Sequence, residues 1–469
     1  MNSVAVVGGG ITGLTAAFYL TRGGIPVTLY EKTDRVGGAI RSTLDQGFLA
    51  EDGPSQITET PEVAALVEDL QLEARRLYPS PEAKARFIVK HGQLMEVPAS
   101  PLGLLGTKLF SGSAKLRLLA EPFIKRGDAA SDESVADFVR RRLGRELLDY
   151  AVDPLISGIY AGDPSRLSLR SAFPKLRELE QTGGSLTAGA LGLLFKGNNR
   201  GYHKDQQLAA APKKKNARGR VLFSFDAGCR VLPDTLAGRL GSSIRLSTPI
   251  TGIARTDRGW NVTVMAGDRE ETNSHSAVLL AAPAHELGSL ANGARGSVSF
   301  APLNEIIYPP IARVTLGFRE DQFPAPIRGF GFLVPSKERF RILGTVFASC
   351  VYPGRAPQDC VNLSSYLGGL RNPGITARSS SELFAATLGD YRTLLGVKGE
   401  PVFASQTVIQ RAIPQYTIGY ERYRQWIADS ELSAPGLFFA GNYRDGISVA
   451  DSIGSGVKGA MRLAAFLNG

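Results

Sequence analysis

The stretch "VAVVGGGITGLTAAFYL", residues 4–20, decides the fold of this chain. Its first four residues, Val4–Val7, are apolar and β-favouring, which is typical of a strand buried on both faces of a parallel sheet. Gly8, Gly10 and Gly13 follow with the spacing G-x-G-x-x-G, and the apolar residues from Leu14 onward predict a helix. The order strand, glycine turn, helix is typical of the start of a dinucleotide-binding unit.

Each glycine of this turn serves a dinucleotide for a different reason. The first permits the tight turn, the second lets the backbone approach a pyrophosphate, and the third lets the helix pack on the strand. The motif alone is weak, but the next strand, "PVTLYE" at 26–31, ends in Glu31. Its carboxylate can accept hydrogen bonds from ribose hydroxyls and would repel a 2′-phosphate. The predicted contacts are Gly8, Gly9, Gly10, Ile11, Thr12, Gly13, Glu31 and Lys32.

A second glycine-rich segment follows at once. "KTDRVGGAIRS" at 32–42 and "EDGPSQI" at 51–57 stand where a nicotinamide dehydrogenase usually continues with another βαβ unit. A second crossing favours a cofactor that lies extended under the chain, so we expect FAD rather than NAD. The predicted contacts are Gly37, Gly38, Ala39, Arg41, Gly53, Pro54, Ser55 and Gln56.

The far end of the chain repeats the order of strand, glycine turn and helix. "GLFFAGNYRDGISVADSIGSGVKGAMRLAAFL" at 436–467 predicts a helix that starts near Val449. The N-terminus of that helix could face an electron-rich group such as the pyrimidine edge of a flavin. The alternative is a terminal βα unit without a ligand. The predicted contacts are Gly441, Asn442, Ile447, Ser448 and Val449.

Length and composition narrow the class of protein. A chain of 469 residues exceeds one hydrophobic core, so we expect two or three domains. The cysteines and histidines lack the spacing of a metal site, so we expect no metal. The odd number of cysteines argues against a disulfide scaffold, which favours a reducing compartment. The opening strand leaves no room for a targeting segment, and no apolar run reaches the roughly 18 residues of a membrane span. The residues concerned are Cys229, Cys350, Cys360, His91, His203, His275 and His285.

The net charge of +10 is concentrated in one segment. Residues 196–220 carry eight Lys or Arg residues and one Asp, which gives +7. The segment lacks apolar periodicity and predicts a mobile basic loop. It lacks interleaved aromatic residues that could stack on bases, so we expect no nucleic-acid partner. Attraction to an anionic membrane surface is a better functional interpretation of this basic segment than nucleic-acid binding.

On these motifs the chain resembles the FAD-dependent amine oxidase and desaturase superfamily. The resemblance rests on GGGITG, Glu31, "RVGG" and the C-terminal "AGN" stretch. More narrowly, the chain is similar to the protoporphyrinogen oxidases of haem and chlorophyll synthesis. The segments that carry this second resemblance are "DPLISGIYAGDPSRLSLRSAFPKLRELE" (153–180), "SFDAGCRVLPDTL" (224–236), "RGFGFLVPSKE" (328–338) and "AIPQYTIGY" (412–420).

The resemblance implies a function. Such enzymes oxidise protoporphyrinogen IX to protoporphyrin IX, a six-electron reaction in which hydrides pass to the flavin and molecular oxygen is the usual acceptor. The flavin carries the chemistry, so no catalytic side chain is expected. Coproporphyrinogen III oxidation, amine oxidation, carotenoid desaturation and a non-catalytic flavoprotein scaffold remain alternatives.

The resemblance also implies a substrate site. Arg86 stands where the family binds a propionate, and a guanidinium suits a carboxylate. Its local sequence, "RFIVKHGQL", predicts a short hairpin with Gly92 in the turn. The other implied residues are Gly158, Phe330, Gly331, Leu333 and Tyr366, which would line the faces of the macrocycle. Without the resemblance, Arg86 would be a surface arginine and "GFGFLV" ordinary sheet core.

The predicted fold class is α/β, with a discontinuous Rossmann-like FAD-binding domain. We assign residues 1–85, 221–297 and 405–469 to this domain, and a strand at 244–250 would bring Ile250 to the adenine side of the cofactor. A mixed-sheet substrate domain takes residues 86–97 and 298–404. An inserted helical membrane-binding domain takes residues 98–220, with the basic loop at 196–220.

Residues 98–127 carry the membrane prediction. They mix Leu, Phe and Ile with Lys and Arg, a composition that suits the plane of a bilayer interface, although a helical subdomain core is the alternative. The resemblance implies peripheral membrane attachment and a homodimer. We expect a cytoplasmic, membrane-associated protein of bacterial origin, with porphyrinogen and oxygen as its small-molecule partners.

Overall fold

The computed structural model describes residues 3–98, 103, 106–128, 130–187, 221–292 and 299–469. The predicted basic loop at 196–220 lies outside these described residues.

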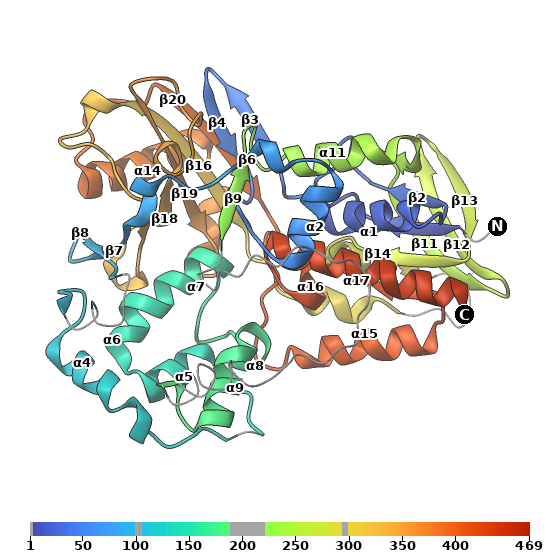
Figure 1. Cartoon of the computed structure of the whole chain (residues 1–469), viewed down its shortest axis with the longest axis horizontal. Helices are drawn as coiled ribbons and strands as arrows, with labels where there is room; N and C mark the ends of the chain where they lie inside the picture. The colour runs from blue at the N-terminus through green and yellow to red at the C-terminus, as the bar shows by residue number, and fades with distance from the viewer. Residues whose placement is uncertain (1–2, 99–102, 104–105, 129, 188–220, 293–298) are drawn as a thin grey trace.

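A five-stranded parallel sheet stands at the centre of the right-hand half of the molecule (Figure 1). Val4 and Val6 pack on one face against α1, α11 and α17, while Ala5 and Val7 pack on the other. Burial on both faces explains why the opening strand is apolar throughout, as predicted. In spatial order the strands are β10 (Ile244–Arg245), β2 (Val27–Tyr30), β1 (Val4–Val7), β14 (Ala277–Leu280) and β21 (Leu437–Phe439), and the helices are α1 (Ile11–Arg22), α11 (Val231–Leu240) and α17 (Val449–Asn468).

A four-stranded sheet covers the second face of the parallel sheet. Trp260, Val262 and Val264 bury their side chains against it. The predicted strand at 244–250 is wrong in extent, because Ser247 has a positive φ of 49° and a turn separates β10 from β11. The strands are β13 (Arg269–His275), β12 (Gly259–Ala266), β11 (Ile250–Thr256) and β15 (Ala291–Asn292), with α12 (Ala284–Leu287) and α15 (Glu421–Ser433) nearby.

Short strands join the two halves of the molecule. They form the hairpin of β3 (Ser42–Asp45) and β4 (Phe48–Glu51), and a small sheet of β5 (Ile57–Thr58), β9 (Leu222–Phe225) and β6 (Arg76–Leu77), next to α2 (Pro61–Asp69).

A seven-stranded mixed sheet forms the upper left of Figure 1. One face packs on α14 (Ser380–Leu395), where Leu316, Phe332 and Leu363 are buried. The predicted hairpin is confirmed, since β7 pairs with β8 around Gly92 at φ 70°. In spatial order the strands are β20 (Phe403–Ile409), β16 (Ile311–Arg319), β19 (Cys360–Gly368), β18 (Ile342–Phe347), β17 (Gly331–Leu333), β7 (Arg86–Lys90) and β8 (Gln93–Glu96), with α13 (Ala348–Val351) between β18 and β19.

Residues 106–128 and 130–187 are largely helical and occupy the lower left of Figure 1. Arg142, fully buried, donates to Glu180 Oε1 at 2.5 Å and to Glu121 Oε1 at 3.2 Å, so ionic contacts connect these helices. The helices are α4 (Gly112–Leu119), η3 (Glu121–Phe123), α5 (Val135–Arg142), α6 (Arg145–Leu147), η4 (Leu148–Val152), α7 (Asp153–Tyr160), α8 (Leu169–Ala172) and α9 (Pro174–Gly183).

The mixed α/β architecture predicted from the sequence is confirmed. Within the described part of the chain, no helix combines the length and the apolar character that a bilayer span requires.

Candidate functional site: a dinucleotide cradle beside an apolar sheet face

The first glycine turn has the geometry that its spacing predicts. Gly8 has φ 105°, and a Cβ there would lie 2.8 Å from Ala282 N. A Cβ on Gly13 would lie 2.0 Å from Gly8 O, so only glycine lets α1 pack this closely on the turn. At Gly10, by contrast, a Cβ would meet nothing within 4 Å. The backbone at Gly10 therefore faces open space at the start of α1.

The N-terminus of α1 is left without a side-chain cap. Its N-cap residue is Gly10, which has no side chain to accept a hydrogen bond, so the N–H groups of the first turn remain available. A pyrophosphate is the group that such a helix start binds best.

Glu31 is held beside this turn. Gly9 N donates to Glu31 Oε2 at 2.7 Å, and the N–H and hydroxyl of Thr33 donate to Oε1 at 2.9 and 2.7 Å. The fixed carboxylate keeps lone pairs for ribose hydroxyls. Thr248 N donates to the Glu31 carbonyl at 2.8 Å, two residues before Ile250 in the chain. Lys32 instead extends to Glu286, with Nζ 2.8 Å from Oε1.

The second glycine-rich segment lies directly on the first. Gly37 N donates to Gly9 O at 2.8 Å, and a Cβ on Gly38 would stand 3.3 Å from Gly10 Cα. A Cβ on Gly53 would lie 1.9 Å from Ala39 O, so the residues 37–41 and 52–53 are also in contact.

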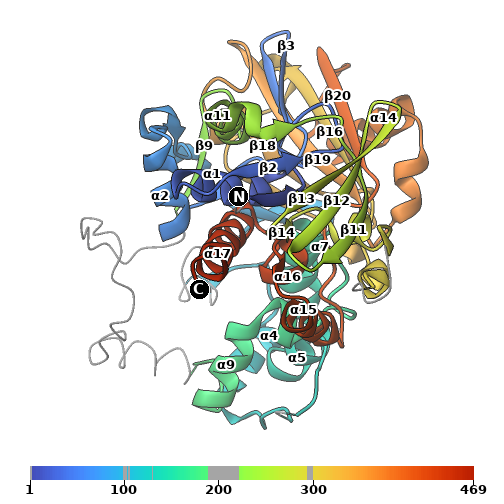
Figure 2. The ribbon, with the colours of Figure 1, turned by 90° about the vertical axis from the view of Figure 1, so that its right-hand side faces the viewer.

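The C-terminal helix α17 completes the cradle. It runs beside α1 in both views (Figures 1 and 2), and Thr12 Oγ1 donates to Ser452 O at 3.1 Å. Ser448 caps α17 through Asp451, and Gly441 N donates to Ser455 Oγ at 2.8 Å. Both ends of the described chain thus meet at one site.

FAD fits this arrangement. The uncapped start of α1 and the open backbone at Gly10 suit a pyrophosphate, and Glu31 suits a ribose. The N-terminus of α17 presents its positive dipole end to the same region. The fold therefore brings three stretches that are far apart in sequence into contact with one another.

The register of the seven-stranded sheet places the predicted substrate residues on one face. Arg86 pairs with Gly331, Leu333 with Gly344, and Gly344 in turn with Tyr366. Residues two apart in a strand share a face, so Arg86, Gly331, Leu333 and Tyr366 lie on the face opposite α14.

Arg86 stands at the edge of this face. Its side chain is exposed, and its guanidinium lies 4.8 Å from the centre of the Phe330 ring. It has no ion pair with any carboxylate in the described residues, so its donors are available to a ligand.

Helix α7 approaches the same face. Arg371 donates to Val334 O at 2.8 Å and to Ser157 Oγ at 2.9 Å, which ties the helix to the sheet. A Cβ on Gly158 would lie 2.6 Å from Leu333 Cδ2, so the backbone of α7 lies directly against the Leu333 side chain.

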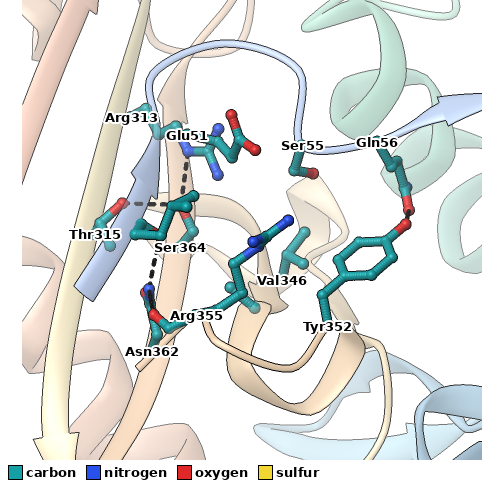
Figure 3. Close-up of a pocket in the computed structure, with 12 residues that line it drawn as sticks. Glu51, Ser55, Gln56, Arg313, Thr315, Val346, Tyr352, Arg355, Asn362 and Ser364 are labelled. Atoms are coloured by element: carbon teal, nitrogen blue, oxygen red, sulfur yellow. Dashed lines mark hydrogen bonds between the residues drawn. The ribbon is translucent and has the colours of Figure 1, made fainter. Parts of the chain in front are cut away.

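A buried polar pocket beside this face was missed from the sequence (Figure 3). It lies between the strand that leads to Ser55 and Gln56 and the strands β16, β18 and β19. Burial raises the pKa of Glu51 in this pocket. The available signal was a single arginine at the centre of an apolar strand, "IARVTLGF" (311–318). The other polar residues of the pocket include Arg313, Thr315, Tyr352, Arg355, Asn362 and Ser364.

The described histidines and cysteines lie outside the predicted site, and His203 falls outside the described residues. His275 contacts Ser3 and Tyr30, and His285 packs on Tyr308. In the described ranges, no three His, Cys, Asp or Glu side chains are grouped to hold a metal ion. A cavity of about 690 Å³ includes Cys350 and Cys360 among its lining residues but none of the predicted site residues.

Three comparisons agree with this geometry. Protoporphyrinogen oxidase 2 of Arabidopsis thaliana is 35% identical over 99% of this chain and 94% of its own length. Coproporphyrinogen III oxidase of Bacillus subtilis is 28% identical over 97% of this chain and 96% of its own length. A crystal structure from Exiguobacterium sp. 255-15, of a protein provisionally named protoporphyrinogen oxidase, superposes with a TM-score of 0.80 at 25% identity, covering 100% of this chain and 99% of that one.

A model of the family described as flavin containing amine oxidoreductase matches residues 11–464. The flavin in that description agrees with the cradle and confirms the predicted FAD cofactor. Because the match runs through nearly the whole chain, the chain belongs to the flavin containing amine oxidoreductase family.

Proposed function

We propose that the protein is an FAD-dependent oxidase that converts protoporphyrinogen IX to protoporphyrin IX with molecular oxygen as acceptor. The observation that carries the proposal is the shared sheet face, where an unpaired arginine stands beside apolar and aromatic side chains next to the dinucleotide cradle. The plant relative with that name, similar over the full chain, supports the same substrate.

The side chains bind and orient the substrate. Arg86 holds a propionate through its planar donors, and Phe330, Leu333 and Tyr366 contact the faces of the macrocycle and exclude water. Bound FAD supplies a ring that accepts hydrides. No side chain of the shared face is a histidine or a carboxylate. We therefore assign no general base.

An aerobic assay of the purified holoenzyme tests the proposal. Protoporphyrinogen should give porphyrin fluorescence at a rate well above autoxidation, and the flavin should bleach when the same substrate is added without oxygen. Amines should give no turnover. A flavin that stays oxidised with porphyrinogen would overturn the proposal and leave a flavoprotein without this activity.

Coproporphyrinogen III is the second candidate substrate, because the Bacillus subtilis relative spans nearly the whole chain. Both substrates carry propionates, and Arg86 alone does not distinguish them. Comparing kcat/KM for the two porphyrinogens decides between them. We expect the larger value for protoporphyrinogen.

We further propose the division into domains given by the sequence, with one boundary moved from residue 405 to residue 410: FAD-binding residues 1–85, 221–297 and 410–469, substrate-binding residues 86–97 and 298–409, and helical residues 98–220. The hydrogen bonds between β20 and β16 support the assignment of residues 403–409 to the substrate sheet. We also infer a homodimer from the family resemblance, which sedimentation analysis of the holoenzyme tests.

Peripheral membrane attachment through the helical part is likewise a proposal. Leu116, Leu119 and Phe123 are 69%, 62% and 89% exposed on α4 and η3. Exposed Lys108, Lys125 and Arg126 lie near them in the chain. Apolar side chains with neighbouring cations suit the interface of an anionic bilayer. Such a protein would lie on the cytoplasmic side of a membrane.

A further inference from the structure

Two buried guanidinium groups line the polar pocket (Figure 3), and neither forms an ion pair with a carboxylate of the described residues. Arg313 and Arg355 are 4% and 2% exposed. The hydrogen bonds that they donate within the described residues all go to neutral oxygens. Arg313 donates to Ser364 Oγ and Gly53 O, and Arg355 to Ser224 Oγ, Phe225 O and Asp226 O.

The two arginines differ in what they hold. All the donated bonds of Arg355 go to β9 and the residue after it, so it has a structural role there. Arg313 reaches across to the predicted cofactor segment, with Nη1 2.5 Å from Gly53 O. Its Nη2 has no hydrogen-bond partner among the described residues. Register with Tyr366 places Arg313 on the substrate face, and its guanidinium lies 5.2 Å from that ring's centre.

Glu51 offsets the positive charge of this pocket only in part. Ser42 Oγ and Cys229 N donate to its carboxylate at 2.5 and 2.9 Å, and no ion pair joins it to either arginine. Burial raises its pKa, which disfavours its negative charge. Two guanidiniums against one such acid leave a buried positive charge, and a buried charge without a partner is unfavourable unless a ligand compensates it.

We propose that Arg313 is a positioning residue for the flavin: it fixes the Gly53–Gln56 segment, and its charge stabilises the negative charge that the ring gains on reduction. A hydride carries two electrons and one proton from a substrate carbon to the neutral ring, which becomes an anion. The substrate then releases a proton from a pyrrole nitrogen. The inference rests on the proposed function for this hydride transfer and for nothing else.

The test measures the cofactor without porphyrinogen. The midpoint potential of bound FAD and the dissociation constant of its adduct with sulfite are determined for the holoenzyme and four variants. Sulfite adds to the ring to form an anionic adduct, so its dissociation constant reports how well the site stabilises negative charge on the ring. Arg313→Met removes the charge, Arg313→Lys keeps it, Glu51→Gln removes the opposing acid, and Thr315→Val alters the same strand face without a change in charge.

Arg313→Met should lower the two-electron reduction constant at least tenfold, about 30 mV, and weaken sulfite binding at least tenfold. In Arg313→Lys, which keeps the positive charge, the reduction constant and the sulfite dissociation constant should stay within about threefold of the parent values. Glu51→Gln should shift both quantities in the opposite direction, and Thr315→Val should leave them unchanged.

Equal values for Arg313→Met and Thr315→Val would overturn the inference, as would a loss in Arg313→Lys as large as that in Arg313→Met. If Arg313→Met fails to fold, Glu51→Gln decides, and an unchanged potential in that variant rejects the charge effect. Unchanged potentials together with normal porphyrinogen turnover would sink only this inference. A holoenzyme that binds FAD but ignores porphyrinogen would sink only the proposed function.

Discussion

Gly10 and Gly13 stand three residues apart, yet they serve the protein differently. A Cβ on Gly13 would collide with Gly8 O, whereas a Cβ on Gly10 would meet no protein atom. Gly13 is therefore needed for folding, and Gly10 is needed only where a ligand comes close to the backbone.

The variant Gly10→Val should fold but retain no FAD, because its side chain fills the space of the pyrophosphate. Flavin absorbance per protein and circular dichroism measure the two properties. Gly238→Val is the matched control, since a Cβ there also meets nothing within 4 Å and lies away from the cradle. Full flavin occupancy in Gly10→Val would contradict the assignment.

Arg86→Ala should raise KM for the porphyrinogen about tenfold and leave FAD bound, because a charge-assisted bond to a carboxylate is lost. Steady-state kinetics with the holoenzyme measure this. Arg86→Lys should recover part of the loss, and Lys84→Ala, which removes an exposed neighbouring cation, should behave like the parent. An unchanged KM in Arg86→Ala would remove Arg86 from the site.

The single residues of the site differ in whether they could be predicted from the sequence. The glycines and Glu31 were predictable because their spacing is local. Arg86 came only from a resemblance. Arg313 was missed because its role depends on the pairing of β16 with β19, and contacts between strands far apart in sequence leave no local pattern.

At the scale of elements, strands and helices with strong patterns were predicted well. The opening strand, α1, α17 and the β7–β8 hairpin lie where their sequences indicate. The strand at 244–250 was too long, since a non-glycine residue with positive φ leaves little signal in sequence. The order of the seven strands could not be predicted, because burial in the assembled molecule decides it.

The contact of β13 with β2 predicts a pH dependence. His275 is buried between Ser3 and Tyr30, and burial lowers its pKa below its ordinary value of 6.5. The unfolded chain therefore binds a proton more readily, so stability present above pH 6.5 should decline as the pH falls below it. Melting temperatures from pH 8 to about 5 measure this.

His275→Gln should melt at a lower temperature but with a flatter pH dependence. His91→Gln removes an exposed histidine instead and should keep the slope of the parent protein. Identical slopes in all three proteins would exclude His275 as the source.

For the whole molecule, the motifs at both ends of the sequence predicted one discontinuous cofactor site, and the helix contact between α1 and α17 agrees with it. The middle of the chain was harder to predict, because apolar helices suit a membrane interface and a domain core equally well.

Vesicle binding separates these two uses. The double variant Leu119→Ser and Phe123→Ser should lose at least half of its cosedimentation with anionic liposomes, because two exposed apolar side chains no longer enter the bilayer. Leu432→Ser, which removes an 81% exposed leucine on α15, should bind as the parent does. Equal binding by all three proteins would reject this surface as the anchor.

The packing of α17 on α1 has a consequence for biosynthesis. During translation the glycine turn of β1 and α1 leaves the ribosome long before the helix that lies beside it. A nascent chain therefore cannot close the dinucleotide cradle until α17 has emerged, so flavin incorporation should follow the synthesis of residues 1–468.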